Sequence, residues 1–213
     1  HFLDPLGVPE SQRHFVPAAR DDAEAACADY EAEIAAAGGI DIQILGIGRN
    51  GHIAFNEPGT PFETLTHLSI LTDSTRQANA PHFTDGNTPA HAMTMGPRSI
   101  LKARQILLLA SGESKAEAIY QMLCGPLHED CPASLLRLHP HCTLVLDQAA
   151  ASRLSFPLAQ YTSLPLATFS PQDSLPPSCA RVLVAAPHPD DASISCGGTL
   201  ARLQKQGSAL HLV

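Results

Sequence analysis

The stretch Leu45–Gly59, LGIGRNGHIAFNEPG, constrains the fold of this chain more than any other part of the sequence. An apolar run over residues 40–47, rich in β-branched side chains, leads into it and ends at Gly48. Such a run, bounded by glycine, predicts a buried strand followed by a tight loop. Ligands of open α/β sheets bind at the loops after the carboxyl ends of strands. The sequence therefore predicts a ligand site directly after residue 47.

The predicted loop carries one imidazole and one carboxylate, which can converge on a small ligand. His52 follows a second glycine, Gly51, and Glu57 lies a few residues further on. An imidazole exchanges protons near neutral pH, and a neighbouring carboxylate can tune it. A glycine turn with a solvated histidine gives the same short pattern, G-x-x-G-H. The full stretch, which continues through Phe55–Pro58, separates the two interpretations.

Taken whole, the stretch resembles the signature of glucosamine-6-phosphate deaminases, sugar-phosphate enzymes related to the 6-phosphogluconolactonases. The lactonases share the Gly-His core, whereas the Phe-Asn-Glu-Pro sequence of residues 55–58 favours the deaminase branch. The resemblance covers roughly residues 1–150. It implies the conversion of glucosamine 6-phosphate and water into fructose 6-phosphate and ammonia, a hydrolytic isomerisation of amino-sugar catabolism that uses no cofactor.

The resemblance also implies roles for individual residues. His52 promotes opening of the sugar ring, with Glu57 hydrogen-bonded to it or to the substrate. Asn50 stands where many relatives have Asp, and its neutral amide can orient the imidazole but stabilises its cation less than a carboxylate. Arg76 and Lys115 match the T-R and S-x-K contexts in which the family places phosphate-binding cations. Without the resemblance, each of these two cations is more often a surface charge.

The family's proton-transferring Asp and its Ser/Gly-rich phosphate loop lie upstream of the region matched here. The resemblance therefore implies that residues 1–213 alone are incomplete and inactive. Two other functions stay open for the parent protein. One is a non-catalytic, regulatory sugar-phosphate-binding module, and the other is a hydrolase that resembles the 6-phosphogluconolactonases.

Strand and helix patterns alternate along the chain, which is typical of an α/β fold. Helical patterns cover about residues 22–37 and 115–123, and strand patterns cover 66–72, 105–110 and 142–146. Near-continuous apolar strands predict a sheet that is buried on both faces. We expect a mostly parallel, Rossmann-like sheet with helices on both faces, followed by a truncated second α/β unit.

A change in composition predicts the domain boundaries. Proline, serine and threonine dominate residues 155–179, which is typical of an extended linker between a deaminase-like domain at 1–154 and a second unit at 180–213. A strand pattern, then HPDD at residues 188–191 and GGT at 197–199, resembles the start of the LmbE-like (PIG-L-like) zinc de-N-acetylases. By that resemblance His188 and Asp191 are zinc ligands and Asp190 is the base.

Composition excludes several other classes of protein. The net charge of −8 and the pI near 5.7 argue against nucleic acid or anionic membranes as partners. The six cysteines form no C-x-x-C pair, and no apolar run approaches the ~20 residues needed to cross a bilayer. We expect a cytoplasmic protein with reduced thiols, a small sugar phosphate as its partner, and assembly into a homo-oligomer as one option.

Overall fold

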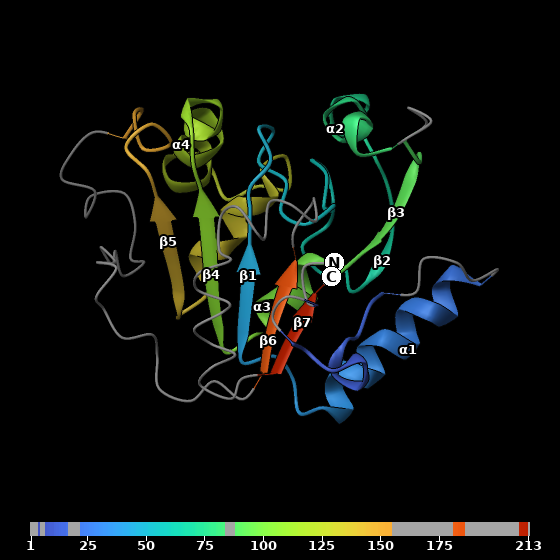
Figure 1. The fold of residues 1–213 in the computed structure, drawn as a ribbon. Coiled ribbons are helices and arrows are strands. Elements are labelled where there is room, and N and C mark those ends of the chain that lie inside the picture. The colour runs from blue at the N-terminus through green and yellow to red at the C-terminus, as the bar shows by residue number, and fades with distance from the viewer. Residues whose placement is uncertain are drawn as a thin grey trace.

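The computed structural model describes residues 4, 7–16, 22–83 and 88–154, and the backbone of residues 181–185 and 209–212 (Figure 1). Its centre is a five-stranded parallel sheet with the strand order β5-β4-β1-β6-β7. The strands are β1 (Ile42–Leu45), β4 (Gln105–Ala110), β5 (Cys142–Leu146), β6 (Arg181–Ala185) and β7 (Ala209–Leu212).

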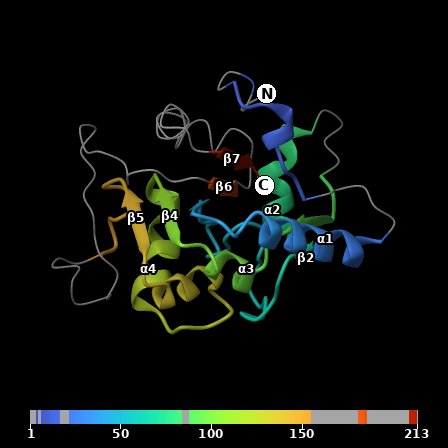
Figure 2. The ribbon, with the colours of Figure 1, turned by 90° about the horizontal axis from the view of Figure 1, so that it is seen from below.

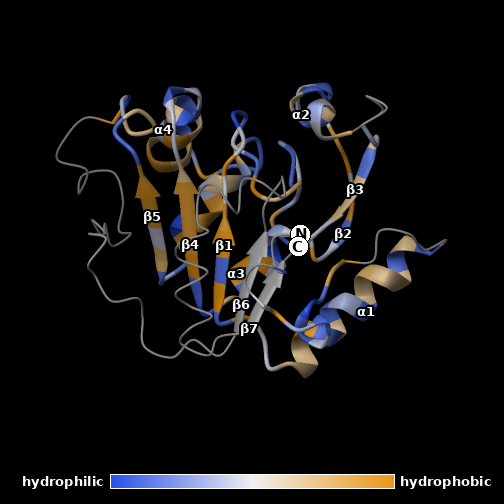
Figure 3. Ribbon diagram, viewed as in Figure 1, coloured by the Kyte–Doolittle hydropathy of each residue, from blue (hydrophilic) through white to orange (hydrophobic). Residues whose placement is uncertain are grey.

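Strand β1 lies in the middle of the sheet and positions the loop that follows it. Leu45, its last residue, pairs with Leu108 of β4 on one side and with Ala185 of β6 on the other. All the residues of β1 are buried. Figure 3 shows apolar residues along most of β4 and β5, its neighbours on one side. The predicted buried strand before the loop is therefore confirmed.

Helices cover the sheet on the face that Figure 2 shows below the strands. They are α3 (Pro97–Leu101), α4 (Ala116–Cys124) and the 3-10 segment η4 (Pro132–Leu138). Ile119 and Met122 of α4 join Leu108 of β4 in one core cluster, and each of the three is fully buried. Burial of each such side chain contributes about 1.5–3 kcal/mol. This layer packs α4 against the sheet.

Strands β2 (His67–Ile70) and β3 (His91–Thr94) form a separate antiparallel pair. The strand predicted at 66–72 is confirmed, but it lies outside the parallel sheet. Burial alternates at its end: Ser69 is buried, whereas Ile70 is 73% exposed. A half-buried, alternating strand is typical of antiparallel pairing. Helix α1 (Ala23–Ala36) packs against β2, and α2 (Asp73–Asn79) follows it.

Three further 3-10 segments are short: η1 (Glu10–Gln12), η2 (Ala80–His82) and η3 (Glu113–Lys115). The expected α/β fold, a parallel sheet flanked by helices, is confirmed. Strands β6 and β7 extend that same sheet, while the predicted linker lies outside the described residues. The division into 1–154, 155–179 and 180–213 stays a prediction.

Within the described part of the chain, every helix is too short or too polar for a membrane crossing.

Candidate active site

The loop after β1 folds into a compact turn held by its own backbone. The N–H of Gly48 donates to the carbonyl of His52 at 2.8 Å, and the N–H of Gly51 donates to the carbonyl of Gly48 at 3.0 Å. Gly51 has a φ of 84°, a conformation that other residues rarely adopt. These contacts bring His52 back over the end of β1.

Gly48 leaves room for the imidazole ring of His52. A Cβ atom at position 48 would lie 2.3, 2.4 and 2.5 Å from the Cε1, Nδ1 and Nε2 atoms of that ring. Such contacts are far shorter than van der Waals distances, so the ring occupies the space that a side chain would fill. The His52 ring can therefore take this position only because residue 48 is a glycine.

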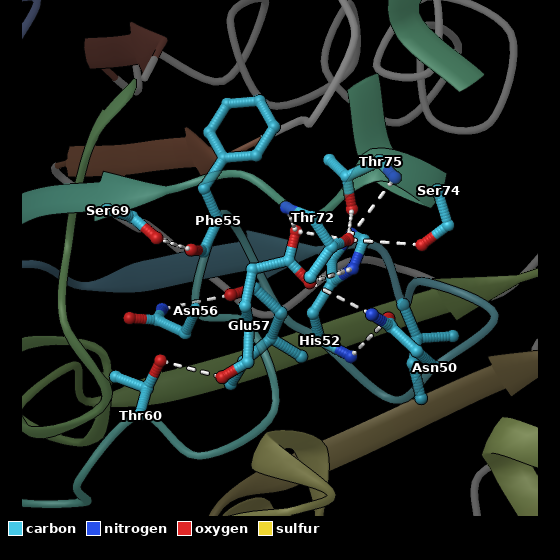
Figure 4. Close-up of polar contacts among 12 residues, drawn as sticks. Asn50, His52, Phe55, Asn56, Glu57, Thr60, Ser69, Thr72, Ser74 and Thr75 are labelled. Carbon is cyan, nitrogen blue, oxygen red and sulfur yellow. Dashed lines mark hydrogen bonds and ion pairs between the residues drawn. The ribbon is translucent and has the colours of Figure 1, made fainter. Parts of the chain in front are cut away.

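His52 and Glu57 form a buried pair. Nδ1 of His52 lies 3.7 Å from Oε2 of Glu57, and the two residues are 9% and 5% exposed (Figure 4). This separation is within ion-pair range but too long for a direct hydrogen bond. A small movement of either side chain would bring the two groups into hydrogen-bond contact. The arrangement suits an acid–base group whose orientation a carboxylate controls.

Asn50 connects the two members of the pair. Its Nδ2 donates to Oε2 of Glu57 at 2.9 Å, and its Oδ1 accepts from the backbone N–H of His52 at 3.3 Å. In these two bonds the amide meets the carboxylate and the backbone of His52, not the imidazole ring. The expected orienting effect of Asn50 on the ring would therefore act through Glu57.

The other oxygen of Glu57 is held by a residue that sequence reasoning missed. The backbone N–H and the Oγ1 of Thr72 lie 3.3 and 3.2 Å from Oε1 of Glu57 (Figure 4). Thr72 is the N-cap of α2. Nothing in the local sequence connects this threonine with the loop, because Thr72 and Glu57 are 15 positions apart in the chain.

Asn56 and its neighbours fix the loop rather than line a ligand site. Asn56 is fully buried, and its Nδ2 donates to the carbonyls of Ile53 and Met95 at 2.9 and 2.8 Å. The carbonyl of Phe55 accepts from Oγ of Ser69 at 2.7 Å. Ala54 adopts a φ of 49°, which is strained for alanine. These contacts join the loop to β2 and the end of β3 and hold Glu57 in place.

The two predicted phosphate-binding cations lie on α2 and at the start of α4, and both helices lie at the end of the molecule toward which β1 and β4 point (Figure 1). Lys115, at the start of α4, donates from Nζ to the carbonyl of Ile47 at 2.8 Å. Arg76, on α2, contacts the carbonyl of Thr88 at 3.4 Å and the carboxylate of Asp73 at 3.7 Å. The structure thus places Lys115 directly against the loop, whereas these contacts of Arg76 lie beyond it.

A cavity of about 500 Å³ opens beside the loop, but it is not centred on the pair. Its lining includes Asn50, Gly51, Gln121 and Cys131, but neither His52 nor Glu57. Half of its lining residues, including His128, are exposed. We therefore locate the candidate active site by the polar contacts of His52 and Glu57 and not by this cavity.

The described residues give no support for a metal site. Within them, no group of three His, Cys, Asp or Glu side chains could hold a metal ion. Cys131, His139, His141 and Cys142 lie close together in the sequence, but a zinc site there is disfavoured because His139 uses both ring nitrogens. Nε2 contacts the carbonyl of Ala103 at 2.7 Å, and Nδ1 accepts from the N–H of His141 at 3.1 Å. The predicted zinc residues, His188, Asp190 and Asp191, lie outside the described residues.

Fold and site together define an α/β protein with a buried histidine–glutamate pair at the carboxyl edge of a parallel sheet. Residues 1–145 match the family described as glucosamine-6-phosphate isomerases/6-phosphogluconolactonase. The chain belongs to this family. Residues 183–213 match a second family, described as GlcNAc-PI de-N-acetylase.

Similar curated proteins are named glucosamine-6-phosphate deaminase. That of Listeria monocytogenes serotype 4b is 57% identical over 134 residues, covering 62% of this chain and 57% of the relative. That of Halalkalibacterium halodurans is 47% identical over 155 residues, covering 72% of this chain and 63% of the relative. The chain thus spans somewhat more than half the length of these relatives.

Solved structures give the same picture. A monomeric glucosamine-6-phosphate deaminase is similar with a TM-score of 0.60 and 52% identity, over 62% of this chain and 56% of that one. A 6-phosphogluconolactonase from Trypanosoma cruzi has a TM-score of 0.50 at 22% identity, over 66% of this chain and 55% of that one. At that identity the second similarity shows the fold alone.

Proposed function

We propose that the native protein is a glucosamine-6-phosphate deaminase, which converts glucosamine 6-phosphate and water into fructose 6-phosphate and ammonia. The observation that carries the proposal is the geometry of His52, which lies on Gly48 and 3.7 Å from the buried carboxylate of Glu57. Relatives that are 47% and 57% identical and bear this enzyme's name support it.

In this proposal His52 catalyses the opening of the sugar ring. It accepts the proton of the 1-hydroxyl group and returns a proton to the ring oxygen as the bond between that oxygen and C1 breaks. General acid–base help of this kind contributes about 10²–10⁴-fold to a rate. Glu57 orients the imidazole, and Asn50 fixes the carboxylate through the bond at 2.9 Å.

The subsequent movement of a proton from C2 to C1 needs a further base. Glu57 is poorly suited to it, because Asn50 and Thr72 already bond to its two oxygens. We therefore assign ring opening, and not the C2-to-C1 transfer, to the described residues.

Lys115 and Arg76 are proposed to bind the phosphate group. Phosphate oxygens accept charge-assisted hydrogen bonds from ammonium and guanidinium groups, which are stronger than neutral ones. Lys115 lies at the loop through its contact with Ile47. The Nε atom of Arg76 is buried with no hydrogen-bond partner among the described residues, and a bound anion would supply one. Of the two, Lys115 has the stronger geometric support.

The sequence of residues 183–213 supports a second, separate proposal, a zinc-dependent de-N-acetylase activity in the same protein. His188 and Asp191 are the proposed ligands and Asp190 the proposed base, from the family match and the HPDD motif alone. Removal of an acetyl group from an N-acetylated amino sugar would yield the amino sugar that a deaminase consumes. A cytoplasmic location and assembly into a homo-oligomer remain predictions.

The test of the proposed function is a comparison of substrates with the purified native protein. Glucosamine 6-phosphate and 6-phosphogluconolactone are supplied separately, and ammonia, fructose 6-phosphate and acid release are followed. We expect ammonia and fructose 6-phosphate in equal amounts, with no acceleration of lactone hydrolysis. Lactone hydrolysis without ammonia would favour a lactonase, and binding of the amino sugar phosphate without turnover would favour the regulatory module.

A further inference from the structure

Thr72 contacts the candidate active site from a different part of the chain. It ends the segment that follows β2 and forms the N-cap of α2, where its Oγ1 accepts from the N–H of Thr75 at 3.3 Å. Its N–H and its hydroxyl both lie within hydrogen-bond distance of Oε1 of Glu57, at 3.3 and 3.2 Å. The side chain therefore serves the helix and the carboxylate at once.

The hydroxyl proton of Thr72 has more than one acceptor within reach. Oγ of Ser74 and Oγ1 of Thr75 each lie 3.0 Å from Oγ1 of Thr72. An ionised carboxylate is the stronger acceptor, because hydrogen bonds to charged groups are about twice as strong as neutral ones. The hydroxyls of Ser74 and Thr75 can rotate and donate elsewhere, whereas an ionised Glu57 can only accept.

Both oxygens of Glu57 are thus held from two sides (Figure 4). Asn50 holds Oε2 from the loop itself, and Thr72 holds Oε1 from the start of α2. Oε2 is also the atom that lies 3.7 Å from Nδ1 of His52. A carboxylate whose two oxygens are both hydrogen-bonded cannot rotate freely. Asn50 and Thr72 therefore set the distance between this carboxylate and the imidazole.

We propose that Thr72 is a positioning residue, which orients Glu57 toward His52 through the bonds of its N–H and Oγ1 to Oε1. The inference deepens the proposed function and rests on it for its kinetic test. Thr72 acts through Glu57 and is not assigned a contact with the substrate.

The test compares four variants with the wild-type protein. Thr72→Val removes the hydroxyl, Thr72→Ser retains it, and Thr72→Asp retains a helix cap but cannot donate to Glu57 when ionised. Asp22→Ala is the matched control for stability, because Asp22 caps α1 by accepting from the N–H of Ala25 at 3.0 Å, far along the chain from the loop.

We expect Thr72→Val and Thr72→Asp to lower kcat by about tenfold or more with little change in KM, since a misplaced group affects the chemical step. Thr72→Ser should restore most of kcat, and Asp22→Ala should lower the melting temperature without lowering kcat. The pH profile of kcat should move in Thr72→Val and stay unchanged in Asp22→Ala. Wild-type kcat in Thr72→Val, or no rescue by Thr72→Ser, would overturn the inference.

A second measurement does not depend on turnover. The ¹⁵N chemical shifts of the His52 ring report its tautomer and hydrogen bonding in the free protein. We expect wild type and Thr72→Ser to share these shifts, and Thr72→Val and Thr72→Asp to differ from them. Identical shifts in all four proteins would refute the positioning role. Absence of ammonia release by the wild type would instead count against the proposed function.

Discussion

Replacing Gly48 by alanine should slow the reaction strongly while leaving the fold intact. The new Cβ would lie 2.3–2.5 Å from three atoms of the His52 ring, whereas ordinary contacts begin at 3.4 Å. The ring must therefore retreat by about 1 Å, because carbon and nitrogen atoms cannot approach so closely. That movement changes the separation of Nδ1 from Oε2 of Glu57, which is 3.7 Å in the structure.

The size of the effect follows from this displacement. A misplacement of about 1 Å can lower a rate by about 100-fold, which corresponds to about 2.7 kcal/mol in the activation barrier. Overpacking costs about 1–3 kcal/mol in folding free energy, so the variant should remain folded if the wild-type protein is stable by more than this amount. Ammonia release from glucosamine 6-phosphate gives the rate, and thermal unfolding gives the stability.

Gly39→Ala is the matched control for Gly48→Ala. Gly39 follows α1, has a φ of 85°, and a Cβ there would meet nothing within 4 Å. Alanine at position 39 strains the backbone by about 1–2 kcal/mol without touching the ring, so stability should fall while kcat is kept. A folded Gly48→Ala protein with wild-type kcat would refute the steric argument, as would an equal loss of kcat in Gly39→Ala.

Two further predictions concern stability and phosphate binding. Burial opposes the ionisation of Glu31, yet hydrogen bonds from Ser99 and Thr66 and the nearby ammonium of Lys102 hold its pKa below the usual value. Because the folded-state pKa is lowered, the stabilisation is present above the unfolded pKa and is lost as the pH falls through the folded pKa. Glu31→Gln should therefore lower the free energy of unfolding by about 1–2 kcal/mol at pH 7, allowing for the partial exposure of Glu31, and the difference from wild type should shrink in acid. Chemical denaturation at several pH values measures this free energy. A difference that does not change with pH would contradict the prediction. Lys115→Ala and Arg76→Ala should each weaken the binding of glucosamine 6-phosphate, measured by calorimetry, while leaving the melting temperature nearly unchanged. If one variant unfolds and the other binds the substrate normally, the proposed phosphate site is wrong.

The parts of the fold that the sequence predicted are those set by local patterns. The apolar residues before Gly48 predicted β1, all of whose residues are buried, and the run at 105–110 predicted β4, in which buried residues alternate with more exposed ones. The proximity of His52 and Glu57 could be expected because both lie on one short segment. Local patterns of this kind can be interpreted without knowledge of the contacts that the rest of the chain makes.

The parts that were missed depend on contacts between distant segments. Thr72 lies in a polar stretch with no local sign that it would meet Glu57. The antiparallel pairing of β2 with β3, with Ser69 opposite Ala92, was likewise not expected. The alternation of polar and apolar residues within one strand does not indicate which other strand pairs with it. The contact of the ring of His52 with Gly48 could not be predicted either, since glycine in a loop usually signals only a turn.

The most direct test of the proposed function is the substitution His52→Asn in the native protein, with ammonia release from glucosamine 6-phosphate as the readout. Asparagine retains polarity and fits the space over Gly48, but it cannot exchange protons near neutral pH. We predict that the rate falls by ~100-fold or more, the usual scale of acid–base help. Binding of the substrate, measured separately by calorimetry, should persist. A folded His52→Asn protein that releases ammonia at the wild-type rate would contradict the assignment of His52 as the acid–base group.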